Sequence, residues 1–98
     1  MVKIVVSKAT AKNKKWKAVF FDDQGKKIKT TNFGDSRYKD YTQTGDKEKR
    51  RLYRERHRKD LKTGDYKRAG FLSYHILWGP TAKVSSNISS YKKRFSLK

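Results

Sequence analysis

KKWKAVFFDDQGKKIKTTNF, residues 14–33, is the stretch that decides the fold of this chain. Its apolar residues Trp16, Ala18 and Phe20 alternate with Lys15, Lys17 and Val19, which is the period of a half-buried strand. Asp22-Asp23-Gln24-Gly25 is a turn sequence, and the β-rich residues 27–33 follow it. The stretch therefore predicts an antiparallel hairpin.

The residues before this hairpin extend it to a third strand. Val2, Ile4 and Val6 alternate with Lys3 and Ser7, and the polar turn Lys12-Asn13-Lys14 leads into the hairpin. We predict an antiparallel meander over residues 2–33. Lysines stud its exposed face, and such charges discourage edge-to-edge pairing with other chains.

The hydrophobic period changes to a helical one in the middle of the chain. Thr44 can cap a charged helix over residues 44–61, and Gly64 supplies its stop signal. Tyr53, His57 and Leu61 fall at spacings of four, with Leu52 beside them, and predict one narrow inward-facing stripe.

Two further helices are expected in the last third. The apolar run at residues 69–78 ends at Gly79-Pro80 and predicts a short buried helix. A terminal amphipathic helix is expected over residues 84–95, because apolar side chains recur there at helical spacing while basic ones occupy the other side. Its inner face is Val84, Ile88, Tyr91 and Phe95, and its outer face is Lys92, Lys93 and Arg94. The fold class is α+β, with one small domain over residues 1–98.

The charge of the chain points to an anionic partner. Its 98 residues carry 27 Lys and Arg against 9 Asp and Glu, a formal net charge of +18. Self-repulsion of this size destabilises an isolated domain, so we expect it to serve binding. There is no Cys, which excludes a disulfide framework and a thiolate zinc site. No metal-ligand spacing occurs, and we expect no cofactor. We also expect neither a secretion signal nor a transmembrane segment, because no apolar run approaches the roughly 20 residues of a span.

Two sets of residues are candidates for function. The first should bind the anionic partner: Lys14, Lys15, Lys17, Arg37, Arg50, Arg51, Arg54, Arg58, Lys92, Lys93 and Arg94. The second should lock the loop after the meander onto the charged helix through a carboxylate, guanidinium and aromatic cluster: Arg37, Asp40, Tyr41, Arg56 and His57. In an alternative interpretation, Arg37, Tyr38 and Tyr41 form a nucleic-acid site with rings stacked on bases.

An enzymatic role finds little support in the sequence. His57 and His75 are the only imidazoles, stand far apart, and each lies in an aromatic or apolar stretch, so we interpret them as core or boundary residues. The carboxylates Asp22 and Asp23 are more simply turn formers than cation ligands. A basic nuclease would have to combine Asp40, Glu48 or Glu55 with His57. We expect no catalytic residue and no small-molecule substrate.

Several motifs in order resemble a family of short basic proteins of large nucleocytoplasmic DNA viruses, chlorovirus-like and mimivirus-like, which infect algae and amoebae. The resemblance spans roughly residues 15–95. The residues that carry it are Phe33 to Thr42, Asp46 to Arg50, Tyr53 to His57, Ala69-Gly70-Phe71 and Ile76-Leu77-Trp78. Members of that family are virion-associated or have no assigned role, so the resemblance implies a viral setting and α+β character but no active site. The Ser-rich residues 85–90 depart from the pattern, and we expect a weaker helix there.

Together these observations predict a non-enzymatic virion component, a minor capsid or core protein synthesised in the host cytoplasm. Its partners would be acidic capsid or core protein surfaces, or the anionic surface of an inner membrane. The alternative is a nucleic-acid-binding protein that coats or condenses viral DNA. Its partner would then be the phosphate backbone of DNA or RNA. Lys outnumbers Arg over residues 1–33. This favours general electrostatic adhesion, because base-specific readout prefers Arg.

Overall fold

A three-stranded antiparallel sheet forms the N-terminal third of the protein. The computed structural model describes residues 1–98, and its strands are β1 (Lys3–Lys8), β2 (Lys14–Phe21) and β3 (Lys27–Asp35), in the order β1-β2-β3. Ile4 lies opposite Phe20, and Trp16 lies opposite Phe33. The predicted meander over residues 2–33 is confirmed.

The turn between β2 and β3 is stabilised by Asp22, whose carboxylate accepts hydrogen bonds from the backbone N–H groups of Gln24 (3.0 Å) and Lys26 (2.8 Å). This local bonding is what Asp favours in turns. The turn-forming role predicted for Asp22 is confirmed.

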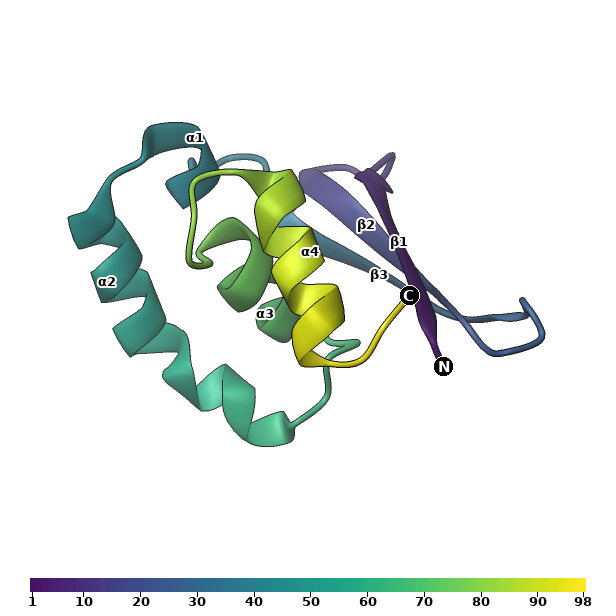
Figure 1. Cartoon of the computed structure of the whole chain (residues 1–98). Coiled ribbons are helices and arrows are strands. Elements are labelled where there is room, and N and C mark those ends of the chain that lie inside the picture. The colour runs from purple at the N-terminus through teal and green to yellow at the C-terminus, as the bar shows by residue number, and fades with distance from the viewer.

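All helices lie on the same side of the sheet (Figure 1). The inward-facing Ile4, Ala18, Phe20 and Phe33 are at most 1% exposed. On the strands' other side, Val5 is 41% exposed, and Ile28 near the hairpin turn is 47% exposed. The sheet is therefore half-buried, which accounts for the alternating pattern of its sequence.

The most apolar run of the chain lies between the sheet and the charged helix in the middle of the sequence. It forms α3 (Ala69–Leu72), which continues without a break into the π-helix η2 (Ser73–Leu77). Leu72 and Ile76 are fully inaccessible. The buried helix predicted over residues 69–78 is present, but its second half has wider turns: the N–H of Trp78 donates to the carbonyl of Ser73 at 3.0 Å. It ends at Leu77, because Trp78 already leaves helical geometry.

The predicted charged helix over residues 44–61 is wrong at both ends. The structure has a one-turn helix α1 (Tyr41–Thr44), the helix α2 (Lys47–His57) and the 3₁₀ helix η1 (Arg58–Thr63). Thr44 ends α1 instead of capping α2, since Gly45 adopts a left-handed conformation with φ 67°. Asp46 caps α2 and accepts from the N–H groups of Glu48 and Lys49, both at 3.1 Å.

The inward stripe of α2 is narrower than predicted. Tyr53 and His57 are half-buried, as is Leu61 in η1, but Leu52 is 48% exposed. Leu52 adjoins Tyr53 in sequence, and neighbouring residues on a helix point about 100° apart. It therefore faces solvent.

The C-terminal helix α4 (Val84–Arg94) packs over η2, one residue shorter than the predicted 84–95. Tyr91 is buried at 2% exposure, while Val84, Ile88 and Phe95 are half-buried against the core. The predicted inner face is confirmed. The expectation that its Ser-rich half would be weaker as a helix stays a prediction.

The chain end returns to the sheet. The N–H of Ile4 donates to the carbonyl of Lys98 (3.0 Å), and the N–H of Lys98 donates to that of Val2 (2.9 Å). Both termini therefore lie together beside β1 (Figure 1). Among the helices, none combines the length and apolarity that crossing a membrane would require.

Candidate functional site

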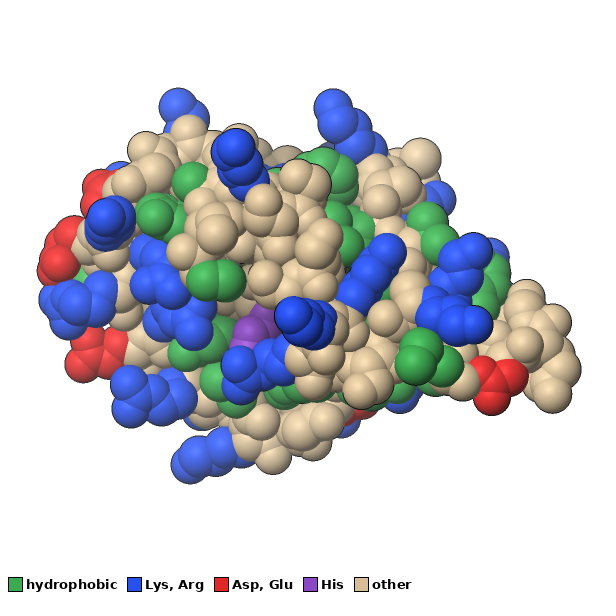
Figure 2. Space-filling model, viewed as in Figure 1, with side chains coloured by type: hydrophobic (Ala, Val, Ile, Leu, Met, Phe, Trp, Pro, Cys, Tyr) green, Lys and Arg blue, Asp and Glu red, His purple; other side chains and the backbone are tan.

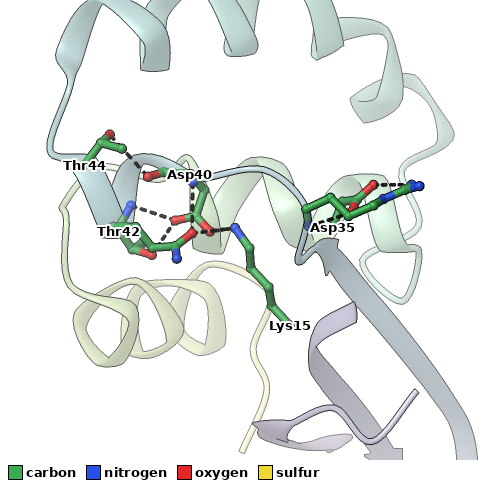
Figure 3. Close-up of polar contacts among 7 residues, drawn as sticks. Lys15, Asp35, Asp40, Thr42 and Thr44 are labelled. Carbon is green, nitrogen blue, oxygen red and sulfur yellow. Dashed lines mark hydrogen bonds and ion pairs between the residues drawn. The ribbon is translucent and has the colours of Figure 1, made fainter. Parts of the chain in front are cut away.

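Asp40 is the centre of the corner between β3 and α1 (Figure 3). Its carboxylate is nearly inaccessible and accepts from the Lys15 ammonium at 2.6 Å. It also caps α1 by accepting from the Thr42 N–H (2.8 Å) and the Thr42 hydroxyl. Gln43 completes a capping box, because its amide oxygen accepts from the Asp40 N–H (3.1 Å) and from Lys15 (2.6 Å). A buried charge is thus both paired and fully hydrogen-bonded.

Asp40 is paired as predicted, but the pair ties the corner to β2 and not to the charged helix. Arg37 and Arg56 were expected to hold Asp40, but Lys15 of β2 does so. Arg37 instead pairs with Asp35 through two hydrogen bonds of 3.0 and 2.8 Å. The reason is the tight turn after β3. It places Arg37 two residues from Asp35, so the guanidinium can donate two hydrogen bonds to that carboxylate.

The Arg37–Asp35 pair lies at the surface. Hydrogen bonds from the Arg37 side chain and backbone lower the pKa of Asp35 to about 2. The same pairing raises the pKa of Arg37. Asp35 is thus anionic at neutral pH, and its charge offsets that of Arg37 at the surface.

The two tyrosines of the corner have opposite environments. Tyr41 is buried at 7% exposure, and the Arg50 guanidinium stands over its ring at 5.6 Å. Tyr38 is 70% exposed. Of the rings in the alternative nucleic-acid interpretation, Tyr41 is therefore structural, and only Tyr38 is open to a ligand.

Three rings form a continuous stack along α2. The rings of His57 and Tyr53 are 4.1 Å apart, and those of Tyr53 and Trp78 are 4.3 Å apart with an angle of 7°. Burial of Tyr53 raises the pKa of its hydroxyl to about 12. His57 is predicted here as a lock residue, and it contributes by stacking and by contacting Asp60 at 3.1 Å rather than by contacting Asp40.

The corner and the ring stack line one cleft of about 660 Å³. Lys14 and Lys15 enter it from β2, Tyr38 to Asp40 from the corner, and Tyr53, Arg56 and His57 from α2. Gly34, at φ 80°, also lines it, and a Cβ there would lie 2.7 Å from the Leu77 side chain and 3.3 Å from that of Lys15. A glycine is required for β3 to approach η2 and Lys15 this closely.

Arg50 and Arg54 have structural partners. Their side chains donate to the carbonyls of Gly79 (2.6 Å) and Trp78 (2.7 Å) respectively. These carbonyls lie at the end of η2, where cations complement the helix dipole. Arg54 also stands over the Tyr74 ring at 4.3 Å, and its partial burial lowers its pKa. Both residues therefore fasten α2 to the core, although they were predicted as anion-binding residues.

The remaining predicted cations lie at the surface or half-buried. The Arg51 guanidinium forms ion pairs with the carboxylates of Glu48 (2.6 Å) and Glu55 (3.1 Å). No carboxylate lies within 4 Å of the others, which are Lys14, Lys17, Arg58, Lys92, Lys93 and Arg94. Figure 2 shows Lys and Arg side chains across the whole visible face, over both the helices and the strands.

The few acidic residues are all engaged within the molecule. Each of the nine Asp and Glu side chains forms an internal hydrogen bond or ion pair. Only five of the 27 Lys and Arg side chains pair with them, so 22 have no carboxylate partner; the five are Lys15, Arg37, Arg51, Lys67 and Arg68. The surface thus presents cationic groups whose charge no carboxylate offsets locally.

The carboxylates and the imidazole of the nuclease combination each have another partner. Asp40 is held by Lys15, while Glu48 and Glu55 are held by Arg51 and His57 contacts Asp60. No group of three or more His, Asp or Glu side chains is placed to hold a metal ion. His75 lies among the rings of Phe71, Tyr91 and Phe95, which is the aromatic setting expected for it.

Trp78, Lys39 and Gly34 belong to the cleft and were missed as site residues by the sequence reasoning. Trp78 was assigned to a buried helix, and nothing in its local sequence indicates that Tyr53 stacks on it. The spacing of four between Tyr53 and His57 predicts that these two rings share a helix face, but it does not indicate the third ring.

These features define a small basic α+β protein whose acidic groups are used internally and most of whose cations have no carboxylate partner. The chain belongs to the family of unknown function DUF5754, which it matches over residues 4–57. The matched segment contains Lys15, Gly34, Asp40 and Tyr53 but ends before Trp78. No curated protein matches the chain significantly, and no solved structure does so either.

Proposed function

We propose that the protein is a non-enzymatic structural component that bridges acidic surfaces in an assembly, as a minor capsid or core protein of a virion would. The observation that carries the proposal is the charge balance: all nine carboxylates are engaged internally, and 22 Lys and Arg have no carboxylate partner. A surface of this kind attracts any extended array of negative charge.

The distribution of the cations supports bridging rather than simple attachment. The molecule is 42 Å long, and the β2–β3 hairpin lies at one end while α2 lies at the other (Figure 1). The hairpin end carries exposed Lys26, Lys27 and Lys29, and the helical end carries exposed Lys47, Lys49 and Lys59. The two groups are separated by more than a Debye length at physiological salt, about 8 Å, so each can engage its own surface.

Light scattering from carboxylate-coated nanoparticles tests the bridging. The protein should bind these particles and cross-link them at low salt. Replacing Lys26, Lys27 and Lys29 by Gln should preserve binding to a single surface but reduce cross-linking, and replacing Lys47, Lys49 and Lys59 by Gln should do the same. The proposal fails if neither triple variant alters cross-linking or if the wild-type protein does not bind.

The virion setting needs a separate measurement. Mass spectrometry of purified and fractionated particles should find the protein in the shell or core fraction, retained when loosely attached proteins are washed away. Detection only in the lysate of infected cells would contradict this part of the proposal. Release by high salt alone would be consistent with electrostatic attachment to acidic capsid or core surfaces, or to an anionic inner membrane.

A second candidate function is binding to nucleic acid. The observation that favours it is the cleft, where stacked rings and exposed Tyr38 lie beside Lys14 and Lys39. Aromatic rings together with free cations are the combination used by proteins that bind single strands. A mobility-shift assay with duplex DNA and single-stranded DNA of equal length tests this candidate, which fails if neither is bound at low salt.

A further inference from the structure

We infer that the cleft between the Asp40 corner and α2 receives an unpaired base of a single-stranded nucleic acid. This inference rests on the second candidate function, nucleic-acid binding, and names the partner and its contact. The observation that carries it is one cleft that combines an aromatic stack, an exposed tyrosine and a net positive charge.

The size and lining of the cleft suit a base and its sugar-phosphate. Its volume of about 660 Å³ falls within the roughly 300–1,000 Å³ typical of ligand pockets. Half-buried Trp78 gives it an aromatic wall, and the buried Phe33, Leu77 and Ser73 lie beneath its surface. Aromatic surface inside a cleft suits a planar heterocycle, and the charged side chains around it suit the sugar-phosphate that the heterocycle carries.

The rings are already ordered for stacking. Tyr53 is fixed between His57 and Trp78 at 4.1 and 4.3 Å, and Arg54 and Arg50 fasten the carbonyls of Trp78 and Gly79 to α2. Both faces of Tyr53 are covered by its neighbours, so a base would stack on an outer face of the stack, on Trp78 or His57. Because these rings are held before a ligand arrives, such stacking costs little ordering entropy. Tyr38 comes from a different element, is 70% exposed, and supplies a ring that remains free to close on a bound base.

The electrostatics of the cleft favour a phosphate at its mouth. The lining cations are Lys14, Lys15, Lys39 and Arg56, and the lining anions are Asp35 and Asp40. Asp40 is paired with Lys15, and Asp35 is paired with Arg37 outside the lining. Lys14, Lys39 and Arg56 therefore remain free for the backbone of a strand whose base lies inside.

The occupant should be a single strand because a duplex keeps its bases stacked and paired. A base can enter the cleft only when it is unstacked, and protein rings then replace its neighbours. An acidic peptide or a duplex would meet the same cations but would leave the ring stack unused. The contribution of the rings therefore distinguishes these partners.

The first test compares a short oligothymidylate with an abasic oligonucleotide of the same length, which has the same phosphates but no bases. The Trp16→Phe variant leaves Trp78 as the only tryptophan, so its fluorescence reports the cleft. We expect oligothymidylate to quench this fluorescence and to bind about 5- to 150-fold more tightly than the abasic strand, the range expected for one stacked base. Equal affinity for both strands without quenching would overturn the inference, while the nucleic-acid candidate would survive as backbone binding.

The second test removes the exposed ring. Tyr38→Ala should weaken oligothymidylate binding about 5- to 100-fold and leave the abasic strand and duplex DNA unaffected, since Tyr38 adds little to the folded core. Leu52→Ala on α2, 48% exposed and outside the cleft lining, is the matched control and should change nothing. If Tyr38→Ala lowers the affinity for all three ligands equally, or for none, the base is not in this cleft. If wild type binds none of them, nucleic-acid binding itself fails.

Discussion

At the scale of single residues, Asp40 joins three parts of the molecule. Its carboxylate contacts Lys15 of β2, caps α1 and lies at the wall of the cleft. A buried carboxylate is stable only while it is paired and hydrogen-bonded, so the loss of one partner leaves a desolvated charge behind. The lock is therefore more sensitive to substitution than any surface ion pair of the protein.

Asp40→Asn should destabilise the protein by about 2–4 kcal/mol. Asparagine keeps the shape and can still cap a helix, but it leaves the half-buried Lys15 ammonium without its counter-charge. Urea unfolding measures the effect. The control is Asp35→Asn, which breaks the exposed pair with Arg37 and should cause little change. If Asp40→Asn unfolds at the same urea concentration as wild type but loses ligand binding, the corner acts as a binding site and not as a lock.

His75 should make stability depend on pH in a defined window. Burial lowers its pKa to about 4, and nearby Arg94 and Arg54 add to this effect. The unfolded histidine titrates near 6.5, so between these values the unfolded chain binds more protons than the folded one. Stability should fall by about 1–2 kcal/mol as the pH drops from 6.5 to 4, after allowance for the partial exposure of the ring.

The measurement is urea unfolding of wild type and His75→Phe at pH 7, 5.5 and 4.5. The phenylalanine ring suits the aromatic surroundings of position 75 but cannot bind a proton. The variant should therefore lose less stability than wild type across this window. Parallel losses in both proteins would show that other groups cause the pH dependence.

At the scale of elements, α4 separates packing from charge. Tyr91 and Phe95 pack on Phe71, with ring centroids of Phe95 at 4.8 Å from Tyr91 and 5.2 Å from Phe71. Lys93 and Arg94 are exposed, and Lys92 is half-buried. The helix thus has one face that serves the fold and another that can serve a partner.

Replacing Lys92, Lys93 and Arg94 by Gln should leave the melting temperature within a few degrees, since surface changes cost about 0.5 kcal/mol each or less. The same variant should bind anionic particles or DNA more weakly. Phe95→Ala should do the opposite: lower stability by about 2–3 kcal/mol, because the ring is half-buried, and preserve the charge. Thermal melting and a binding titration test both. A triple variant that unfolds while Phe95→Ala stays stable would show that the faces are assigned wrongly.

The elements were predictable where the sequence pattern is local. The alternation of Trp16, Ala18 and Phe20 and the bonding of Asp22 in the turn depend on neighbours in sequence, so the meander could be predicted. The boundary at Gly45 could not be predicted, because Thr44 and Asp46 are both residue types that cap helices. Asp46 caps α2 because Thr44 already belongs to α1, the turn that the Asp40 capping box begins. The buried Asn87 was also missed, since its bonds to the carbonyls of Ile76 (2.8 Å) and Thr81 (2.7 Å) join segments that only the fold brings together.

The candidate site was predictable only in part for the same reason. The corner motif and its central carboxylate are visible in the sequence. Lys15 is 25 residues from Asp40, and Trp78 is 25 residues from Tyr53, so neither partner follows from spacing. Nine lysines precede the corner, and nothing in the sequence around Lys15 distinguishes it from the others. Which lysine pairs with Asp40 depends on how β2 is placed beside β3.

At the scale of the whole molecule, the charge is arranged for long-range attraction and not for specific pairing. Every carboxylate is used internally, so the excess of cations is not balanced locally. Repulsion among them opposes folding and weakens with salt. Binding to an anionic surface relieves this repulsion, and we therefore expect polyanions to raise the melting temperature at low salt.

Affinity for duplex DNA should fall by roughly 500-fold between about 50 and 200 mM salt if five cations each neutralise a phosphate. Each contact releases condensed counterions, so the logarithm of the binding constant falls linearly with the logarithm of the salt concentration, with a slope of about −4.5. Anisotropy titrations at several salt concentrations, with two unrelated duplex sequences, provide the measurement. Both sequences should bind about equally, because backbone contacts carry no sequence information. Binding that is insensitive to salt, or a strong preference for one sequence, would contradict the electrostatic origin of the affinity. Replacing Lys92, Lys93 and Arg94 by Gln should lower the slope by up to about 2.7, which counts the phosphate contacts that α4 itself makes.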